Sequence, residues 1–331
     1  MTNFSSRSNA KWIGITAAAI TIFIWTAFVV IGRASAKYTL TPLDMVFCRM
    51  LGAGLVAVPW GLFLVNRMRQ ARLGDALQAN TDKPYSLFGL SPLPLRQTLV
   101  LGFFGGLFSP LAYTGFFYAP AAHGAVLMPG TLPLSTALFA MFILNERFTK
   151  QRAFGLVLIA CGGLLVGGLS LLKAFEGGEV WKGDVLFVCA SSSWAMYSVM
   201  ARKYKVDPVQ ATVAFTVLTL LCFAPLYGLL AYARALPFGL VTHLADAPQL
   251  EIIMQMVMQG IGSGIVGNIG FTLMLKHFGP VRSTMMTALV PSLSALSAVY
   301  FLGEPLYWNL IAGLVLALTG VALGILSTAK K

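Results

Sequence analysis

Long apolar runs, separated by short polar segments, fill almost the whole chain. Ten of these runs have about the 20 residues that an α-helix needs to cross a bilayer. They lie at about 12–32, 42–65, 98–119, 122–144, 153–172, 184–201, 209–230, 252–275, 280–302 and 307–327. The pattern predicts an all-α integral membrane protein with ten transmembrane helices, and it leaves no room for a separate soluble domain.

The apolar runs form two similar sets of five. Residues of the first set recur in the second in the same order: Trp25 as Trp194, Pro42 as Pro208, Pro59 as Pro225, Met128 as Met286, Pro133 as Pro291, Glu146 as Glu304, Gly155 as Gly313 and Gly162 as Gly320. Because each set holds an odd number of spans, the second copy must be upside down relative to the first. We therefore expect two inverted five-helix repeats, residues 1–172 and 184–327, with a substrate site between them.

The composition and the distribution of charge agree with a membrane location. Only 10% of residues are charged and 57% are hydrophobic, whereas soluble domains carry about 25% charged residues. With the N-terminus inside, the outer loops hold few basic residues, namely Arg33, Lys37, Lys173, Lys182 and Arg234. Basic residues concentrate on the cytoplasmic side, so both termini are predicted to be cytoplasmic, in the inner (plasma) membrane. Topology accounts for the net charge of +12, and no nucleic-acid partner is expected.

The first run has an alternative interpretation as a secretory signal peptide. Arg7 and Lys11 precede it, and Ala34-Ser35-Ala36 resembles a cleavage site. Its apolar stretch is longer than the roughly 7–15 residues of a signal peptide. We therefore expect a retained transmembrane helix.

The fourth and ninth spans, which both contain proline, end in similar motifs, LNERF at 144–148 and LGEPL at 302–306, and a glycine-rich span follows each. This arrangement resembles the EamA family of the drug/metabolite transporter superfamily. The resemblance covers nearly the whole chain except the first ten residues and the loop at 66–97. The first motif departs from the usual pattern, with Asn145-Glu146-Arg147 where the second has Gly303-Glu304-Pro305. The resemblance implies export or exchange of small metabolites, amino acids among them, and does not identify the substrate.

Pro129, Pro133 and Pro291 lie inside the fourth and ninth predicted membrane helices. Proline removes a backbone donor and kinks a helix, and the carbonyl that it frees must meet another helix, water or a ligand. We expect these positions to act as gates or to line the substrate pathway. The alternative is a kink that serves packing alone.

A second group of residues places polar and aromatic side chains in the middle of spans. It comprises Trp25, Ser109, Tyr113, Trp194, Tyr197 and Asn268. Tryptophan in membrane proteins is usually interfacial, and an asparagine within the membrane needs a polar partner. These residues are predicted to line the substrate pathway, with core packing between helices as the alternative.

The charged candidates are Arg49, Glu146 and Glu304. Arg49 lies within the second span, where a charge is a functional candidate by default. The alternative is a side chain that reaches the outer surface, with Asp44 as a helix-end partner. Glu146 and Glu304 stand where a new helix begins, and a structural role at the helix start is predicted for both.

Motifs of enzymes and pumps are missing. The sequence has no GxxxxGK[ST] loop, no HExxH and no Ser/His arrangement, so we expect no catalytic residue, metal site or cofactor. The predicted function is secondary transport of a small organic metabolite by alternating access, with export of an amino acid or similar amphipathic solute. Multidrug or organic-cation export is the alternative, and a channel-like or non-transporting membrane protein is the rival of another class. The expected partners are the substrate and the lipid bilayer; whether two copies form a homodimer stays open.

Overall fold

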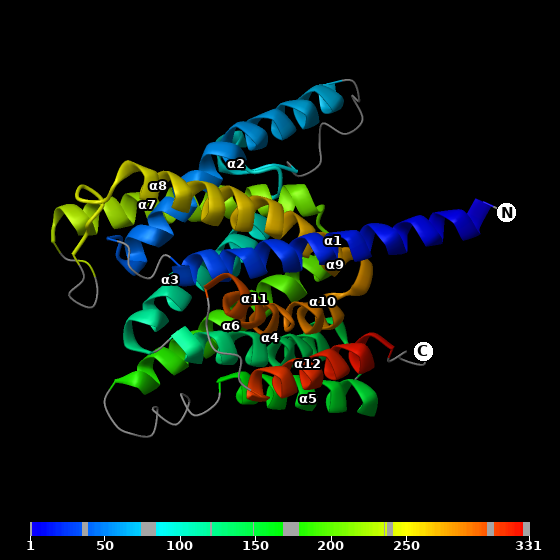
Figure 1. The fold of residues 1–331 in the computed structure, drawn as a ribbon. Coiled ribbons are helices and arrows are strands. Elements are labelled where there is room, and N and C mark those ends of the chain that lie inside the picture. Colours follow the sequence, from blue (N-terminus) through cyan, green and yellow to red (C-terminus); the bar gives the residue numbers. More distant parts are fainter. Residues whose placement is uncertain are drawn as a thin grey trace.

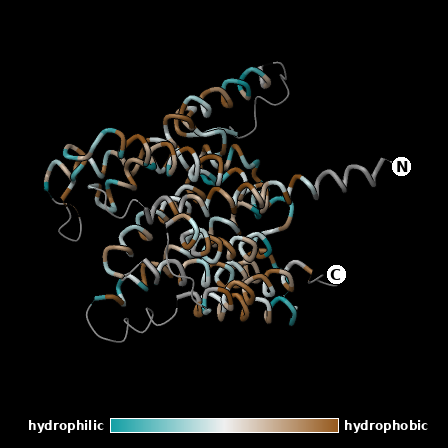
Figure 2. Tube along the Cα trace, in the orientation of Figure 1, coloured by the Kyte–Doolittle hydropathy of each residue, from teal (hydrophilic) through white to brown (hydrophobic). Residues whose placement is uncertain are grey.

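The computed structural model describes residues 2–34, 39–73, 84–119, 121–147, 149–167, 179–234, 236, 241–302 and 308–326. These residues form helices with short connections, and no β-strand occurs among them. Figure 1 shows most of the helices running side by side along one direction. Apolar residues predominate along the helices, and hydrophilic residues concentrate at helix ends and loops (Figure 2).

The first half of the chain contains five long helices. They are α1 (Thr2–Ala34), α2 (Pro42–Leu73), α3 (Leu95–Tyr118), α4 (Ala121–Leu144) and α5 (Lys150–Gly167), with a short 3₁₀ turn, η2 (Leu87–Gly89), between α2 and α3. The second half contains α6 (Val180–Lys203), α7 (Pro208–Tyr232), α8 (Gln249–Gln255), the π-helix η5 (Met256–Gly267), α9 (Asn268–Phe278), α10 (Pro280–Thr287), α11 (Val290–Leu302) and α12 (Trp308–Leu326).

The helices follow the ten predicted runs, with differences in detail. The eighth run forms α8, η5 and α9 in succession, and the ninth is divided into α10 and α11. The helices α1 and α2 extend beyond the apolar runs, to Thr2 and Leu73. The residues outside the runs are helical too, and a search for apolar runs does not detect them. Among the described residues, seven helices are long and apolar enough to cross a membrane, and two shorter apolar helices, Trp12–Ala27 and Ile311–Gly324, accompany them.

Local sequence signals explain where the helices of the second half begin. Asp207 caps α7: its Oδ1 accepts hydrogen bonds from the backbone N–H groups of Val209 (3.0 Å) and Gln210 (3.3 Å), and Pro208 occupies the first helical position. Gly279, with φ of 81°, separates α9 from α10. Glycine adopts this left-handed conformation at little cost, and Pro280 then starts the next helix.

The packing between the two halves is reciprocal. Helix α3 packs against α6 and α7, while the corresponding part of the second half, η5 and α9, packs against α1 and α2. Likewise α4 packs against α6, as α11 packs against α1. The two second helices, α2 and α7, contact each other, as do the two fifth helices, α5 and α12. Each of these contacts therefore has a counterpart in which the halves are exchanged.

The crossing of α5 and α12 shows this relation at the level of single residues. A Cβ atom on Gly155 would lie 2.7 Å from the carbonyl oxygen of Gly320, and one on Gly162 would lie 2.6 Å from that of Gly313. Gly155 matches Gly313 in the sequence repeat, and Gly162 matches Gly320. The two helices therefore meet crosswise through equivalent glycines, as antiparallel helices related by a two-fold axis do.

Hydrogen bonds of Asp44 connect the start of α2 to the second half of the chain. Its carboxylate is buried and accepts hydrogen bonds from the backbone N–H groups of Thr41 and His243, both at 3.0 Å. It also accepts a short hydrogen bond from the hydroxyl of Tyr227, near the end of α7. One charged side chain thus joins three segments.

We expect Asp44→Ala to lower the free energy of unfolding by about 3 kcal/mol, because it leaves buried donors without a charged acceptor. Thermal unfolding of the purified protein in detergent measures the effect. Asp246→Ala is the matched control, since its side chain is 74% exposed and forms an ion pair with His243 at 3.5 Å. Equal midpoints for the two variants would contradict the anchoring role.

Candidate functional site

Arg49 is a buried charge in the contact between the halves. It lies on α2, seven residues from the first residue of that helix, or about 10 Å along its axis. The residue is 9% exposed, and its Nη1 donates a hydrogen bond to Ser263 Oγ on η5 (3.2 Å). Arg49 therefore points across the contact toward the second half and not toward the end of α2.

Tyr113 on α3 completes the contact. Its hydroxyl lies against the Arg49 guanidinium and donates a hydrogen bond to Gln259 Oε1 on η5 (2.5 Å). We call Arg49, Tyr113, Gln259 and Ser263 the Arg49 cluster. It brings together a cation and a phenol of the first half with two neutral acceptors of the second.

No carboxylate among the described residues forms an ion pair with Arg49. Asp44, the partner suggested by its position five residues earlier, is held by Thr41, Tyr227 and His243 instead. The positive charge of the cluster is therefore satisfied by neutral oxygen atoms.

The π-helix η5 supplies the two acceptors of the cluster, Gln259 and Ser263. It spans 12 residues, whereas π-helical geometry is usually confined to single turns, frequently at functional sites. Its backbone touches that of α2: a Cβ on Gly52 would lie 2.3 Å from Met256 O, and one on Gly260 would lie 2.8 Å from Arg49 O. These glycines allow the close approach that puts Gln259 and Ser263 beside Arg49 and Tyr113.

Trp25 and Trp194, the matching tryptophans of the repeat, contact each other in a buried hydrophobic cluster. Their ring centroids are 6.4 Å apart, and Phe271 lies 5.4 Å from Trp25 and 5.6 Å from Trp194. Tyr197 stacks on Trp194 at 4.7 Å. Trp194 and Tyr197 are 5% and 0% exposed, so in this conformation these predicted pathway residues form a packed aromatic centre and not the wall of an open cavity.

The polar pathway candidates are also buried. Asn268 begins α9, and its Nδ2 donates to the carbonyl of Gly264 in the preceding turn (2.8 Å), so its own helix supplies a partner. Ser109 is buried on α3, one turn before Tyr113. The structure thus brings Tyr113 to Arg49, while Asn268 lies on the element that follows η5.

The proline-containing segments differ between the halves. Helix α4 runs without interruption through Pro129 and Pro133. In the second half, α10 ends at Thr287 and α11 begins at Val290, just before Pro291. Matching sequences therefore adopt a continuous helix in one half and an interrupted one in the other.

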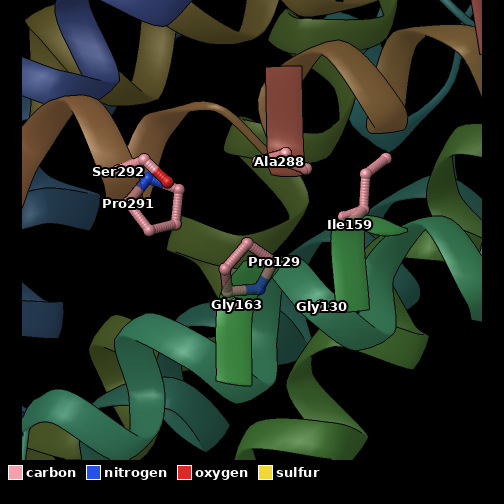
Figure 3. Close-up of a pocket in the computed structure, with 8 residues that line it drawn as sticks. Pro129, Gly130, Ile159, Gly163, Ala288, Pro291 and Ser292 are labelled. Carbon is pink, nitrogen blue, oxygen red and sulfur yellow. The ribbon is translucent and has the colours of Figure 1, made fainter. Parts of the chain in front are cut away.

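A small space lies between these segments (Figure 3). Pro129 and Gly130 line it from α4, and Ala288, Pro291 and Ser292 line it from the second half. Ile159 of α5 and Ala317 of α12, which are matching positions of the repeat, also line it. The cavity volume is about 10 Å³, enough for about one water molecule. The two proline segments therefore face each other across a nearly closed gap.

Glu146 and Glu304 were predicted to stabilise helix starts. Glu146 lies four residues before α5 and contacts the Arg152 guanidinium at 3.6 Å. Thr149 supplies the cap instead, because its Oγ1 accepts from the backbone N–H of Arg152 (3.2 Å). Glu304 lies outside the described residues.

Sequence reasoning missed Gln259 and Ser263. The signal was present: both are polar residues inside an apolar run, four positions apart, and Gly260, Gly262 and Gly264 lie next to them. Such a pair lies on one face of a helix. From this apolar run, only Asn268 was predicted as a site residue.

Comparison with known proteins decides the family. A model of the EamA-like transporter family matches residues 12–168 and 181–326. The chain belongs to this family. The resemblance inferred from the fourth and ninth spans is thereby confirmed, and the two matched regions correspond to the two halves of the chain.

Relatives of this EamA-like protein are also named as transporters. The uncharacterized transporter YyaM of Bacillus subtilis (strain 168) is 24% identical over 222 residues, or 67% of this chain and 69% of that protein. The uncharacterized transporter YcxC of the same organism is 23% identical over 257 residues, or 74% and 79%. An uncharacterized transporter of Archaeoglobus fulgidus is 23% identical and covers 69% and 76%. The family and these relatives indicate a multi-pass membrane transporter.

A solved structure described as "Crystal structure of protein" has the same fold. It superposes with a TM-score of 0.63 and 19% sequence identity, over 96% of this chain and 97% of that one. At this identity the likeness concerns the fold alone.

Proposed function

We propose that the protein is a secondary transporter that moves a small organic metabolite by alternating access, and that it exports an amino acid or a similar amphipathic solute. In this proposal ten spans form two inverted repeats in the inner membrane. The sequence repeat, the reciprocal packing of the halves and the crosswise glycine contacts of α5 and α12 support the inverted arrangement.

The observation that carries the proposal is the different conformation of matching segments. The fourth segment is the continuous helix α4 in one half and the interrupted pair α10 and α11 in the other. The third segment is the regular helix α3 in the first half and the succession α8, η5 and α9 in the second. A segment that has two conformations of similar energy can switch between them, as a carrier with alternating access requires.

The chemistry between the halves favours an amphipathic solute. The aromatic centre around Trp25 and Trp194, on α1 and α6, offers apolar and π surface. The Arg49 cluster offers polar groups on other helices, of which η5 packs against α1 and α3 packs against α6. Export of an organic cation is the second candidate within the transporter class. The buried positive charge of Arg49 disfavours it, because a cationic solute would be repelled there.

Counterflow in proteoliposomes tests the proposal. Protein reconstituted with a high internal concentration of an unlabelled amino acid should accumulate the same labelled amino acid transiently, with saturation at high concentration. Linear uptake without saturation would indicate a channel-like protein. Absence of flux for amino acids, organic acids and organic cations alike would contradict the transport proposal.

The topology gives a separate prediction. Figure 1 draws the first turn of α1 and the last turn of α12 on the same side of the molecule, which supports placing both termini on one side of the membrane. Alkaline phosphatase fused to the C-terminus should therefore be inactive, because the enzyme folds only after export to the periplasm. A fusion after Leu40, at the predicted outer end of the first hairpin, is the control and should be active. An active C-terminal fusion would overturn the proposed orientation.

A further inference from the structure

We infer that the Arg49 cluster is a binding site for the carboxylate group of the transported solute. The inference rests on the proposed function, since it concerns the solute that the carrier moves. It also specifies that function, because it restricts the substrates to acids and amino acids and assigns the recognition to named residues.

The first argument is the charge of Arg49. Arginine keeps its proton under all ordinary conditions, and a charge removed from water carries a large desolvation penalty unless it is paired. In this conformation Arg49 is 9% exposed and has no carboxylate partner among the described residues. An intramembrane cation without a counter-ion is explained by an anion that binds there during the transport cycle.

The second argument is the pairing of donors and acceptors. The first half supplies two donors, Arg49 Nη1 and the Tyr113 hydroxyl. The second half supplies two neutral acceptors, Ser263 Oγ and Gln259 Oε1. A carboxylate likewise presents two acceptor oxygens, and it forms stronger hydrogen bonds than neutral groups do because it is charged. The two acceptors of η5 are thus the groups that a bound carboxylate would replace.

The third argument is the position of the cluster between the halves. Arg49 and Tyr113 lie on α2 and α3, while Gln259 and Ser263 lie on η5. Rocking of one half against the other would separate these pairs and leave the guanidinium and the phenol without their acceptors. A carboxylate that enters can then replace the lost acceptors, and its release lets Ser263 and Gln259 return. The same contact would close the empty carrier and select the substrate.

Matched acid and amide probes test the site without knowledge of the natural substrate. The probes are phenylalanine and phenylalaninamide, leucine and leucinamide, and benzoate and benzamide. Each pair differs at the group that Arg49 would bind. Thermal unfolding of the full-length protein in detergent, followed by intrinsic tryptophan fluorescence, reports binding. We expect at least one acid to raise the midpoint while its amide leaves it unchanged.

Variants assign the effect to the cluster. Arg49→Gln should weaken binding of the stabilising acid by about ten- to hundred-fold, the loss expected when a charged hydrogen-bond partner is removed. Arg49→Lys keeps the charge without the planar fork and should bind with intermediate affinity; it replaces Arg49→Gln as the test if that variant does not fold. Arg96→Gln, an exposed position on α3, is the control and should bind as the wild type does.

A third variant separates recognition from structure. Arg49→Met removes the buried charge and keeps the length of the side chain, so without probes it should unfold at the wild-type temperature or above. A midpoint far below that of the wild type would show that Arg49 serves as a structural cross-link, and would overturn the assignment. Equal effects of acids and amides on the wild type, or an acid preference that persists in Arg49→Gln, would also overturn it.

Counterflow of the same probes distinguishes this inference from the proposed function. Binding of an acid that depends on Arg49, without counterflow of any probe, would contradict transport and leave the carboxylate site intact. Counterflow of amides as fast as of acids would support transport and refute the carboxylate site.

Discussion

Gly155→Leu should prevent stable folding, with a loss of about 3 kcal/mol or more in the free energy of unfolding. The cause is the contact between two backbones. A Cβ on Gly155 would lie 2.7 Å from the carbonyl oxygen of Gly320 and 3.1 Å from the side chain of Met285. A backbone carbonyl cannot rotate away as a side chain can, so α5 and α12 would have to separate along their whole contact. Overpacking of this kind costs several kcal/mol when the neighbours cannot move.

The fraction of protein that elutes as a single species in detergent, together with its unfolding temperature, measures this effect. Gly228→Leu on α7 is the matched control: it makes the same substitution at a helical glycine whose Cβ would meet nothing within 4 Å. Gly320→Leu should behave as Gly155→Leu does, because its Cβ would lie 2.5 Å from Gly155 O. If Gly155→Leu were as stable as Gly228→Leu, the close contact of α5 and α12 would not exist in the membrane protein.

The glycines at the contact of α5 and α12 show which features could be predicted from the sequence and which could not. The matches Gly155 with Gly313 and Gly162 with Gly320 were visible as a repeat, and so was the division into two sets of five spans. The pairing of Gly155 with Gly320 was not visible, because a repeat relates positions in the two halves and does not state which of them touch. That information requires the relative orientation of the helices, which the packing of many side chains determines together.

Prediction of the Arg49 cluster from the sequence was limited in the same way. Arg49 and Tyr113 were each singled out, since a charge and a polar aromatic residue are unusual inside the membrane. Their association could not be predicted, because they lie on different helices, and Gln259 and Ser263 became partners only through η5. A π-helix rotates its residues relative to an α-helix of the same sequence, so a face assigned with 3.6 residues per turn would place these side chains wrongly.

The proline segments give the second large prediction, in which Pro133→Ala and Pro291→Ala shift the access of the carrier in opposite directions. In this conformation α4 is continuous through Pro133, whereas the matching segment is interrupted between Thr287 and Val290. In the proposed cycle the carrier has a second state, in which α4 is interrupted and the α10–α11 segment is continuous. Alanine restores a backbone donor that proline lacks, and it therefore stabilises the continuous form of whichever segment carries it.

The signs follow from this difference. Pro133→Ala stabilises the continuous α4 and should favour the conformation seen here. Pro291→Ala favours joining of α10 and α11 and should therefore favour the exchanged conformation. A carrier whose two states differ by only a few kcal/mol is shifted strongly by one added hydrogen bond of about 1 kcal/mol and the removal of a steric clash. Both variants should fold, and both should slow counterflow, because each favours one state at the expense of the other.

Accessibility of single cysteines to a membrane-impermeant thiol reagent measures the shift. In a background without Cys48, Cys161, Cys189 and Cys222, the reporters are Thr114→Cys near the predicted outer face and Ser283→Cys near the predicted inner face, both at buried positions. One proline variant should raise labelling of the outer reporter and lower that of the inner one, and the other variant should do the reverse. Pro110→Ala on α3 removes a proline from a third-segment helix and serves as the control. If both gate variants changed labelling in the same direction, or neither changed it, the prolines would serve packing alone, and the exchange of conformations between α4 and the α10–α11 pair would not be part of the transport cycle.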